Sequence, residues 1–325
     1  MKKTIGLIAA TVLLASTSMG MAGTVLKFAH AAPPTDLQEK LAQFFAKEVK
    51  DKTNGEITVQ TYPQGQLGDD QQMLNGTRSG IIDIQMTGLA IMNGMQPETA
   101  VFDLPYMFAS RQHAYKVLDG EVGKKILADM AKFGMKGLAF PENGYRNITN
   151  NRKPIREPED VVGLKIRTNT SVPLNAMFAD LGANPQPLPI AELYTALETG
   201  VVEAQEHPIN VTHSFRYDEV QKYLSLTEHS YSSLFISMNL KKFNSLTPEQ
   251  QKIIEEAAQD ATDYQRELSI EKEEGFIKDL QDRGMQVNRD VDKAAFQANP
   301  AITATWAKYN EQFGPETIEK IQAAK

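Results

Sequence analysis

The sequence contains no cysteine among its 325 residues. This absence excludes disulfide bonds, thiolate metal sites, a cysteine nucleophile and a lipid-modified N-terminal cysteine. Long apolar runs are also missing: after residue 22 no stretch approaches the roughly 20 apolar residues that a transmembrane helix requires. We therefore expect a mature chain that has neither a lipid anchor nor a membrane span.

Basic residues are in short supply as well, 34 against 41 acidic residues. Because nucleic-acid binding depends on basic patches, we expect no nucleic-acid partner. The usual catalytic patterns do not occur: there is no HExxH pair, no GxSxG elbow, no phosphate loop and no dinucleotide-binding glycine motif. The five histidines lack the spacing of a zinc site. The sequence thus gives no positive signal for an enzyme, and we expect no metal and no cofactor.

The first 22 residues have the form of an export signal. Lys2 and Lys3 give a positive start, Ile5–Ala15 is apolar, and small residues precede a cleavage site after Ala22. The apolar run is too short to span a bilayer, although a retained anchor is the alternative. We predict cleavage after Ala22, which leaves a mature chain of net charge −9 outside the cytoplasm.

Strand and helix patterns alternate in the first part of the mature chain. Strands are predicted at Val25–His30, Glu56–Tyr62 and Gly80–Met86, with helices at Thr35–Lys50 and near Asp69–Ser79. Strand, helix, strand, helix, strand is typical of a parallel sheet wound with helices, in which ligands bind outside the carboxyl ends of the strands.

A second series of the same kind follows. Its predicted strands are Met135–Phe140, Gly163–Thr168 and Val201–Gln205, and its predicted helices are Pro173–Leu181 and Ala191–Thr199. About 300 mature residues exceed one typical hydrophobic core, so we expect two lobes with a ligand cleft between them.

The last part of the chain begins with a predicted strand at Ser232–Asn239. A long helix then opens at Thr247, where Pro248 and Gln250 complete a capping box with proline at the first helical position. Met285–Asn288 is predicted as a short strand back in the first lobe.

These patterns predict an α/β fold of two lobes with a multi-strand hinge and a long lobe-spanning helix. After a signal peptide at residues 1–22, the first lobe comprises residues 23–144 and 236–325, and the second comprises 145–235. A hinge of several strands suits closure around a ligand.

Arg167 is the most informative polar residue. It follows Leu164 and Ile166 in the segment GLKIRT, at the carboxyl end of a predicted strand and hence at the rim that faces a ligand. A guanidinium group matches a carboxylate with two parallel hydrogen bonds, which lysine cannot do. A structural ion pair or a surface position is the alternative for this residue.

Nine segments in order carry a resemblance to a known family. They are LKFAH (26–30), PQGQLGDD (63–70), GIIDIQM (80–86), VFDLPYMF (101–108), GYRNITNNRKPI (144–155), GLKIRT (163–168), GANPQPLPIAELYTALETG (182–200), EAQEHPIN (203–210) and EVQKYLSLTEH (219–229). Over essentially the entire mature chain, this series resembles the DctP-type solute-binding proteins of the tripartite ATP-independent periplasmic (TRAP) transporters. The resemblance implies a two-lobed periplasmic binding-protein fold that closes on an organic acid.

The resemblance also implies roles for individual residues. Arg167 matches the arginine that clamps the ligand carboxylate, and Arg146, in GYRN, matches a supporting donor. Many members have Gln-Glu-Asn-Pro where this chain has residues 205–208, so the ligand-touching asparagine of the family is His207 here. The segments ENGYRNITN, IRTNTS and AQEHPIN look most like the 2,3-diketo-L-gulonate binders, with hexuronate and aldonate binders nearby.

The polar residues near these motifs agree with a sugar acid. His207, Asn169 and Asn210 can donate and accept hydrogen bonds, as a ligand with several hydroxyl groups requires, because unpaired buried polar atoms cost roughly 1 to 3 kcal/mol each. For the opposite wall the candidates lie in loops after first-lobe strands, where a helix cap or a solvated loop is the alternative. They are His30, Asp36, Gln38, Asp70 and Thr87.

The implied partners are a small organic acid and the small and large TRAP membrane subunits, with the binding protein itself a monomer. Three alternatives stay open. In the first, the ligand is a C4-dicarboxylate or sialic acid. In the second, the chain is a periplasmic sugar-acid enzyme with His207 as acid or base. In the third, it is a sensory binder that docks on a chemoreceptor or a histidine kinase.

Overall fold

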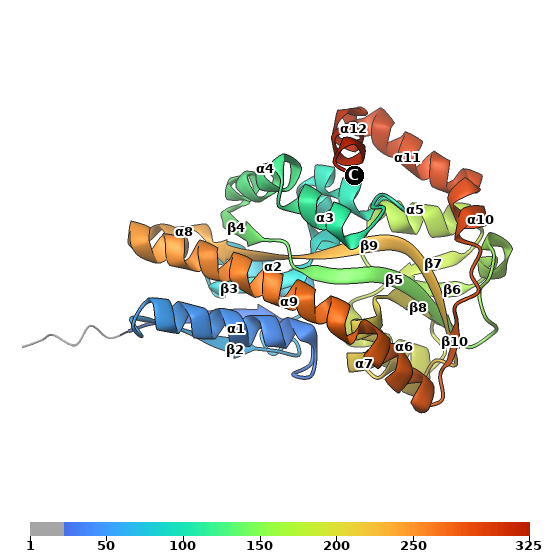
Figure 1. Cartoon of the computed structure of the whole chain (residues 1–325), viewed down its shortest axis with the longest axis horizontal. Helices are drawn as coiled ribbons and strands as arrows, with labels where there is room; N and C mark the ends of the chain where they lie inside the picture. Colours follow the sequence, from blue (N-terminus) through green and yellow to red (C-terminus); the bar gives the residue numbers. More distant parts are fainter. Residues whose placement is uncertain (1–22) are drawn as a thin grey trace, which may run out of the picture.

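The computed structural model describes residues 23–325, so the predicted signal peptide lies outside the described residues. Across residues 23–325, ten strands form one sheet in the order β2-β1-β3-β9-β5-β8-β6-β7, with β4 and β10 also paired to β9. Helices cover this sheet on both sides of the long central strand β9 (Figure 1). The predicted α/β fold of two lobes is confirmed. No helix in this part of the chain is long and apolar enough to cross a membrane.

The first lobe is built around the predicted parallel strands. β1 (Thr24–His30) lies between β2 (Ile57–Tyr62) and β3 (Ile84–Gly88) and runs parallel to both. The connections are α1 (Leu37–Lys52) and α2 (Asp70–Ser79). Because parallel strands point the same way, the loops that follow β1 and β3 meet at one edge of the sheet.

Two strands form the hinge, and the sequence patterns revealed them only in part. β9 (Tyr223–Asn239) pairs with β3 and β4 (Met135–Ala139) through its last residues, and with β5 (Glu142–Asn150) through its first ones. The sequence pattern predicted only the last eight residues of β9 and did not predict β5. β5 and the first half of β9 are rich in polar side chains and so lack a clear strand pattern, although both are almost wholly buried.

The second lobe continues the sheet from β5 through β8 (Ala204–His207) and β6 (Lys165–Thr168) to β7 (Asn184–Pro187). Its helices are α5 (Val172–Asp180), α6 (Ile190–Glu198) and α7 (Ile209–Ser214). The strand predicted at Val201–Gln205 begins three residues later, because Val202 packs into the apolar cluster beneath α6 instead of joining the sheet.

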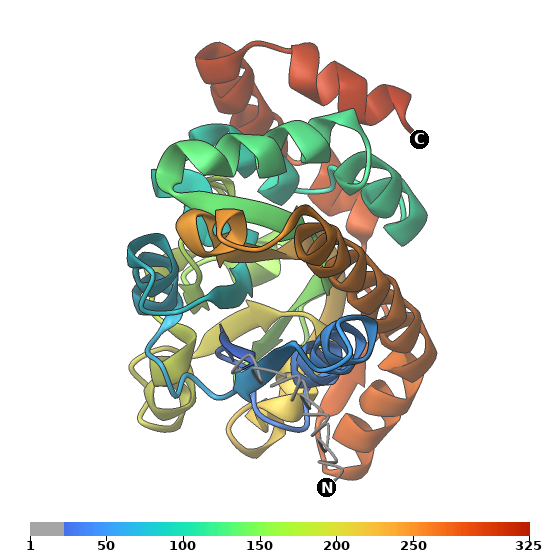
Figure 2. The ribbon, with the colours of Figure 1, turned by 90° about the vertical axis from the view of Figure 1, so that its left-hand side faces the viewer.

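The long helix α9 (Pro248–Asp282) begins with the predicted capping box of Thr247 and Gln250. With 35 residues it is about 52 Å long at 1.5 Å per residue, enough to span both lobes. It runs beside α1 and reaches α7 and β10 (Figures 1 and 2). At the hinge, Gln265 donates to the backbone oxygen of Glu142 at 2.8 Å and accepts from its N–H at 3.1 Å.

The path of the chain after α9 corrects one prediction. β10 (Gln286–Asn288) pairs with the first residues of β9, beside the second lobe, and α11 (Pro300–Phe313) packs on α5. The assignment of all of residues 236–325 to the first lobe is therefore wrong. The reason is the length of α9, which carries the chain across to the second lobe before β10 begins. The chain then returns to the first lobe: Tyr309 of α11 packs into its apolar cluster, and α12 (Glu316–Ala323) packs near α4.

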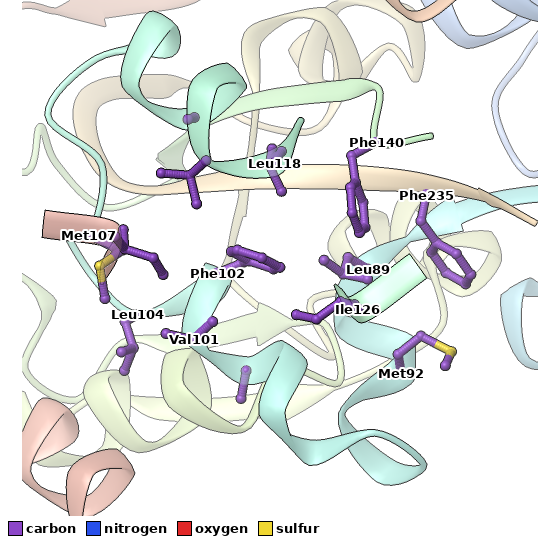
Figure 3. Close-up of a cluster of buried hydrophobic side chains, with 14 of the residues drawn as sticks. Leu89, Met92, Val101, Phe102, Leu104, Met107, Leu118, Ile126, Phe140 and Phe235 are labelled. Atoms are coloured by element: carbon purple, nitrogen blue, oxygen red, sulfur yellow. The ribbon is translucent and has the colours of Figure 1, made fainter. Parts of the chain in front are cut away.

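A large apolar cluster fills the first lobe, where the helical segments of residues 89–130 pack against β9 (Figure 3). Phe102, Phe140 and Phe235 belong to it, and Tyr309 of α11 and Ile321 of α12 join it from the C-terminal segment. The remaining helices of the described chain are η1 (Leu89–Gly94), η2 (Pro97–Asp103), α3 (Arg111–Leu118), α4 (Glu121–Asp129), η3 (Met130–Phe133), η4 (Pro158–Val161), η5 (Tyr217–Glu219), α8 (Leu240–Asn244) and α10 (Lys293–Ala298).

Candidate ligand-binding site

A cavity of about 330 Å³ lies where the two lobes meet, at the loops that follow β1, β3, β6 and β8. This is the size of a small-molecule site. Its polar lining comes from three parts of the fold. The first lobe contributes Gln38, Asp69, Asp70, Gln71 and Thr87, the hinge strands contribute Asn143, Arg146 and Ser232, and the second lobe contributes Arg167, Asn169, Thr170 and His207.

Arg167, at the end of β6, is only 3% exposed and is held by three hydrogen bonds. Its Nε and Nη2 donate to the backbone oxygen of Leu188 at 2.9 and 2.5 Å, and its Nη1 lies 3.2 Å from Nε2 of His207. A guanidinium group has five N–H bonds. Within residues 23–325 these contacts use three of them, which leaves one N–H on Nη1 and one on Nη2.

Arg146, on β5, also lines the cavity but is already paired with a carboxylate. Its Nε contacts Oε2 of Glu206, its Nη2 donates to Oε1 of Glu206 at 2.7 Å, and its Nη1 donates to Oγ of Ser232 at 3.3 Å. Nη2 also donates to the backbone oxygen of Glu206 at 2.5 Å. The expected role as a second donor to the ligand is therefore limited to the one N–H left on Nη1. No role was predicted from the sequence for Glu206, the partner of Arg146.

Glu206 is fully buried on β8, and its contacts keep it charged. Burial alone would raise the pKa of this carboxyl group, but Arg146 and His229 outweigh burial and lower the pKa to about 2. His229 approaches Oε2 at 3.2 Å. Arg146 and Glu206 thus form a buried ion pair beside the cavity, and His229, whose pKa is lowered by burial, contacts Glu206.

His207 lies beside Arg167 and uses both ring nitrogens within the protein. Its Nδ1 is 2.5 Å from Oε1 of Gln205, and its Nε2 faces Arg167. Burial, Arg146 and Arg167 all lower the pKa of His207 well below its ordinary value. The imidazole is therefore neutral, and it contacts a protein amide and the arginine rather than offering a free nitrogen to the cavity.

Three predicted residues of the opposite wall reach the cavity: Gln38, Asp70 and Thr87. Burial raises the pKa of Asp70 to about 6, although Arg167 across the cavity opposes that shift. Oγ1 of Thr87 and Oδ1 of Asn143 are buried in the lining and have no hydrogen-bond partner among residues 23–325. Buried polar atoms are normally paired, so these two atoms are suited to a polar ligand.

Three other predicted residues do not line the cavity. His30 is turned to α1, where its Nε2 lies 2.7 Å from Oε2 of Glu39. Asp36 caps α1 by accepting from the N–H of Gln38 at 2.8 Å. Asn210 is buried in the first turn of α7, outside the lining.

Several lining residues were not predicted from the sequence, among them Asn143, Ser232, Asp69 and Gln71. Asn143 and Ser232 lie on the two hinge strands, where polar residues in an otherwise buried sheet were the available signal. Asp69 and Gln71 flank Asp70 at the start of α2. Within the described chain, no group of three or more His, Cys, Asp or Glu side chains is placed to hold a metal ion.

The chain matches the family model of "Bacterial extracellular solute-binding protein, family 7" (DctP) over residues 28–312. It is 42% identical over 285 residues to the 2,3-diketo-L-gulonate-binding periplasmic protein YiaO of Escherichia coli, with 87% of each chain covered. A TRAP periplasmic solute-binding protein of Polaromonas sp. JS666, bound to D-erythronate, superposes with a TM-score of 0.90 at 35% identity, covering 93% of this chain and 99% of that one.

A second solved structure is the sugar-acid-binding protein DctPAm of Advenella mimigardefordensis in complex with galactonate. It superposes with a TM-score of 0.89 at 32% identity, and the match covers 93% of this chain and 97% of that one. The match of sequence and fold extends over nearly the whole described chain. The protein therefore belongs to the DctP family of bacterial extracellular solute-binding proteins, the substrate-binding subunits of TRAP transporters.

Proposed function

We propose that this protein captures a six-carbon sugar acid of the diketo-gulonate, gulonate or hexuronate type and delivers it to a membrane permease. The observation that carries the proposal is the hydrogen bonding of Arg167. Three hydrogen bonds fix the guanidinium group at the cavity, and one N–H remains on each terminal nitrogen. Two N–H groups match the two oxygens of a carboxylate, so Arg167 is the clamp.

The rest of the lining suits hydroxyl and carbonyl groups. The Asp70 carboxyl group and the unpaired oxygens of Thr87 and Asn143 accept hydrogen bonds from ligand hydroxyls, and Asn169 both donates and accepts. Arg146 contributes its remaining N–H. An apolar acid would leave these groups unpaired at roughly 1 to 3 kcal/mol each.

The relatives support the same ligand class. The Escherichia coli relative is named for 2,3-diketo-L-gulonate, and the two solved structures hold galactonate and D-erythronate, which are all acids that carry several oxygen atoms. In this proposal the signal peptide is cleaved after Ala22, the mature protein is a periplasmic monomer, and it passes its unchanged ligand to a small and a large membrane subunit. It is a binding protein and not an enzyme.

The test is a thermal-shift screen of the purified mature protein, with calorimetry on each hit. The panel contains hexuronates, aldonates, keto-gulonates, C4-dicarboxylates, sialic acid and 2-oxo acids. A ligand that binds the folded state raises its melting temperature. We expect the largest shift from a six-carbon sugar acid that is recovered unchanged after incubation. A shift from short dicarboxylates alone, or chemical turnover of the bound acid, would overturn the proposal.

A further inference from the structure

A continuous row of buried polar side chains leads from the interior of the second lobe to Arg167. Gln221 accepts from Oγ1 of Thr149 at 2.9 Å, and Thr149 accepts from Nε2 of Gln205 at 2.9 Å. Gln205 then contacts Nδ1 of His207 at 2.5 Å, and Nε2 of His207 contacts Arg167 at 3.2 Å. None of the five side chains belongs to a residue that is more than 4% exposed.

The direction of every hydrogen bond in this row is fixed from both ends. At one end the amide of Gln221 donates to the backbone oxygens of Glu203 and Val220, which can only accept. The side-chain oxygen of Gln221 therefore accepts from Thr149. In the same way, Nε2 of Gln205 donates to Thr149, so Oε1 of Gln205 accepts from His207. At the other end the guanidinium group of Arg167 can only donate.

One protonation state of His207 satisfies both ends. The oxygen of Gln205 requires a hydrogen on Nδ1, and Arg167 requires a bare acceptor at Nε2. The other neutral tautomer would place an N–H against an N–H of Arg167. A protonated ring would do the same and would add a positive charge beside Arg167 and Arg146, which both lower the pKa of this histidine.

The sheet register assembles the row from residues that are far apart in the sequence. Thr149 of β5 and Arg167 of β6 are both direct neighbours of Gln205 on β8. Gln205 and His207 are two residues apart on the same strand and so point to the same face. Gln221 lies just before β9 and forms the end of the row opposite Arg167.

We infer that Gln221, Thr149 and Gln205 are positioning residues that hold the proton of His207 on Nδ1, so that Nε2 accepts from Arg167 and orients its carboxylate-binding fork. The inference rests on the proposed role of Arg167 as the ligand clamp. It gives His207 a different task from direct ligand contact. The histidine completes the three hydrogen bonds that hold Arg167 and leave one N–H on each of its terminal nitrogens.

The first test needs no ligand. Nitrogen-15 and carbon-13 spectra of the histidine-labelled mature protein at pH 7 report the tautomer of each ring, and the His207 signals are assigned by their loss in His207→Asn. We expect a neutral ring with its hydrogen on Nδ1. A hydrogen on Nε2, or a protonated ring, would overturn the inference whatever the protein binds.

The second test interrupts the row with a matched pair of variants. Thr149→Val keeps the shape but removes the hydroxyl group, and Thr149→Ser keeps the hydroxyl group. We expect Thr149→Val to give mixed tautomers at His207 and about tenfold weaker binding of the acid identified by the screen. Thr149→Ser is expected to behave like the parent. If Thr149→Val does not fold, Gln221→Met interrupts the same row from its other end.

Two outcomes separate this inference from the proposed function. A changed tautomer with unchanged affinity would show that the row does not position Arg167, and would leave the clamp intact. Full binding by Arg167→Ala would remove the clamp itself, while the ligand-free spectra would still report whether the row fixes the histidine.

Discussion

Ser214 and Asp36, 178 residues apart in the sequence, join the two lobes beside the cavity. Oγ of Ser214, in α7, donates to Oδ2 of Asp36, the residue that caps α1, at 2.5 Å. Asp36 is 2% exposed in this structure. Because the contact joins a residue of the first lobe to one of the second, it would be lost if the lobes moved apart.

We predict that Ser214→Ala weakens ligand binding about tenfold, or 1.4 kcal/mol, because closure loses a hydrogen bond to a buried carboxyl group. Calorimetry on the screened ligand measures the effect. Ser245→Ala is the control, since the hydroxyl group of Ser245 bonds only within α8 and its neighbouring turn. Equal affinities for the two variants would show that the Ser214 contact does not contribute to closure.

Arg167→Lys is expected to reduce affinity by at least about 100-fold, although it keeps the positive charge. A lysine offers a point charge without the planar fork, and if its three donors served Leu188, His207 and the ligand, only one would remain for the carboxylate. Calorimetry again gives the affinity. Arg152→Lys, at an exposed arginine paired with Glu203, should bind as the parent does. Near-parental affinity in Arg167→Lys would contradict the two-pronged clamp.

Glu206→Gln is expected to lower the free energy of unfolding by about 3 kcal/mol at pH 7, because it leaves Arg146 buried without a charged partner. The pKa of Glu206 is lowered to about 2, below its ordinary 4.5. Its contribution is therefore present above pH 4.5 and is lost as the pH falls through 2. Urea unfolding of the parent and the variant measures the loss at pH 7 and, repeated at lower pH, its pH dependence.

Glu203→Gln, three residues away, is the matched control for Glu206→Gln. Its ion pair with Arg152 is between a third and a half exposed, so its loss should change stability by no more than about 0.5 kcal/mol. Similar losses in the two variants would mean that burial does not set the strength of the Arg146 pair.

Removing the carboxyl group of Asp103, in η2, is predicted to raise stability, whereas removing that of Glu206 is predicted to lower it. Burial raises the pKa of this carboxyl group from 3.8 to about 7, and Arg146 only partly opposes the shift. A folded pKa above the unfolded value lowers stability at pH 8, and the loss is relieved as the pH falls from 7 toward 4. We expect Asp103→Asn to be more stable than the parent at pH 8.

The stability advantage of Asp103→Asn should shrink by about 3 kcal/mol between pH 8 and pH 5, as the parent takes up its proton. Urea unfolding of both proteins at the two pH values tests this difference. Asp290→Asn, at a side chain that is 81% exposed, is the control and should show no such change. A constant difference would show that Asp103 does not change its proton between these pH values.

Where the sequence carried a regular pattern, it predicted the structure well. The strand at residues 24–30 and the helix after Thr247 follow directly from apolar runs and capping residues, which are local properties of the chain. β5 escaped prediction because its buried residues are polar and find their partners on other strands. Arg146 is the example within the site: its position was predicted, but its pairing with Glu206 depends on the β5–β8 register.

The sequence by itself determined the α/β class, the two lobes, the family resemblance and the choice of Arg167, because all of these depend on local spacing and motif order. Only the tertiary structure decided which N–H groups of Arg167 remain for a ligand, and that His30 and Asp36 serve α1 rather than the cavity. It also decided that β10, directly after α9, lies beside the second lobe. Each of these depends on contacts between residues distant in the sequence, which strand register and the length of α9 fix in three dimensions.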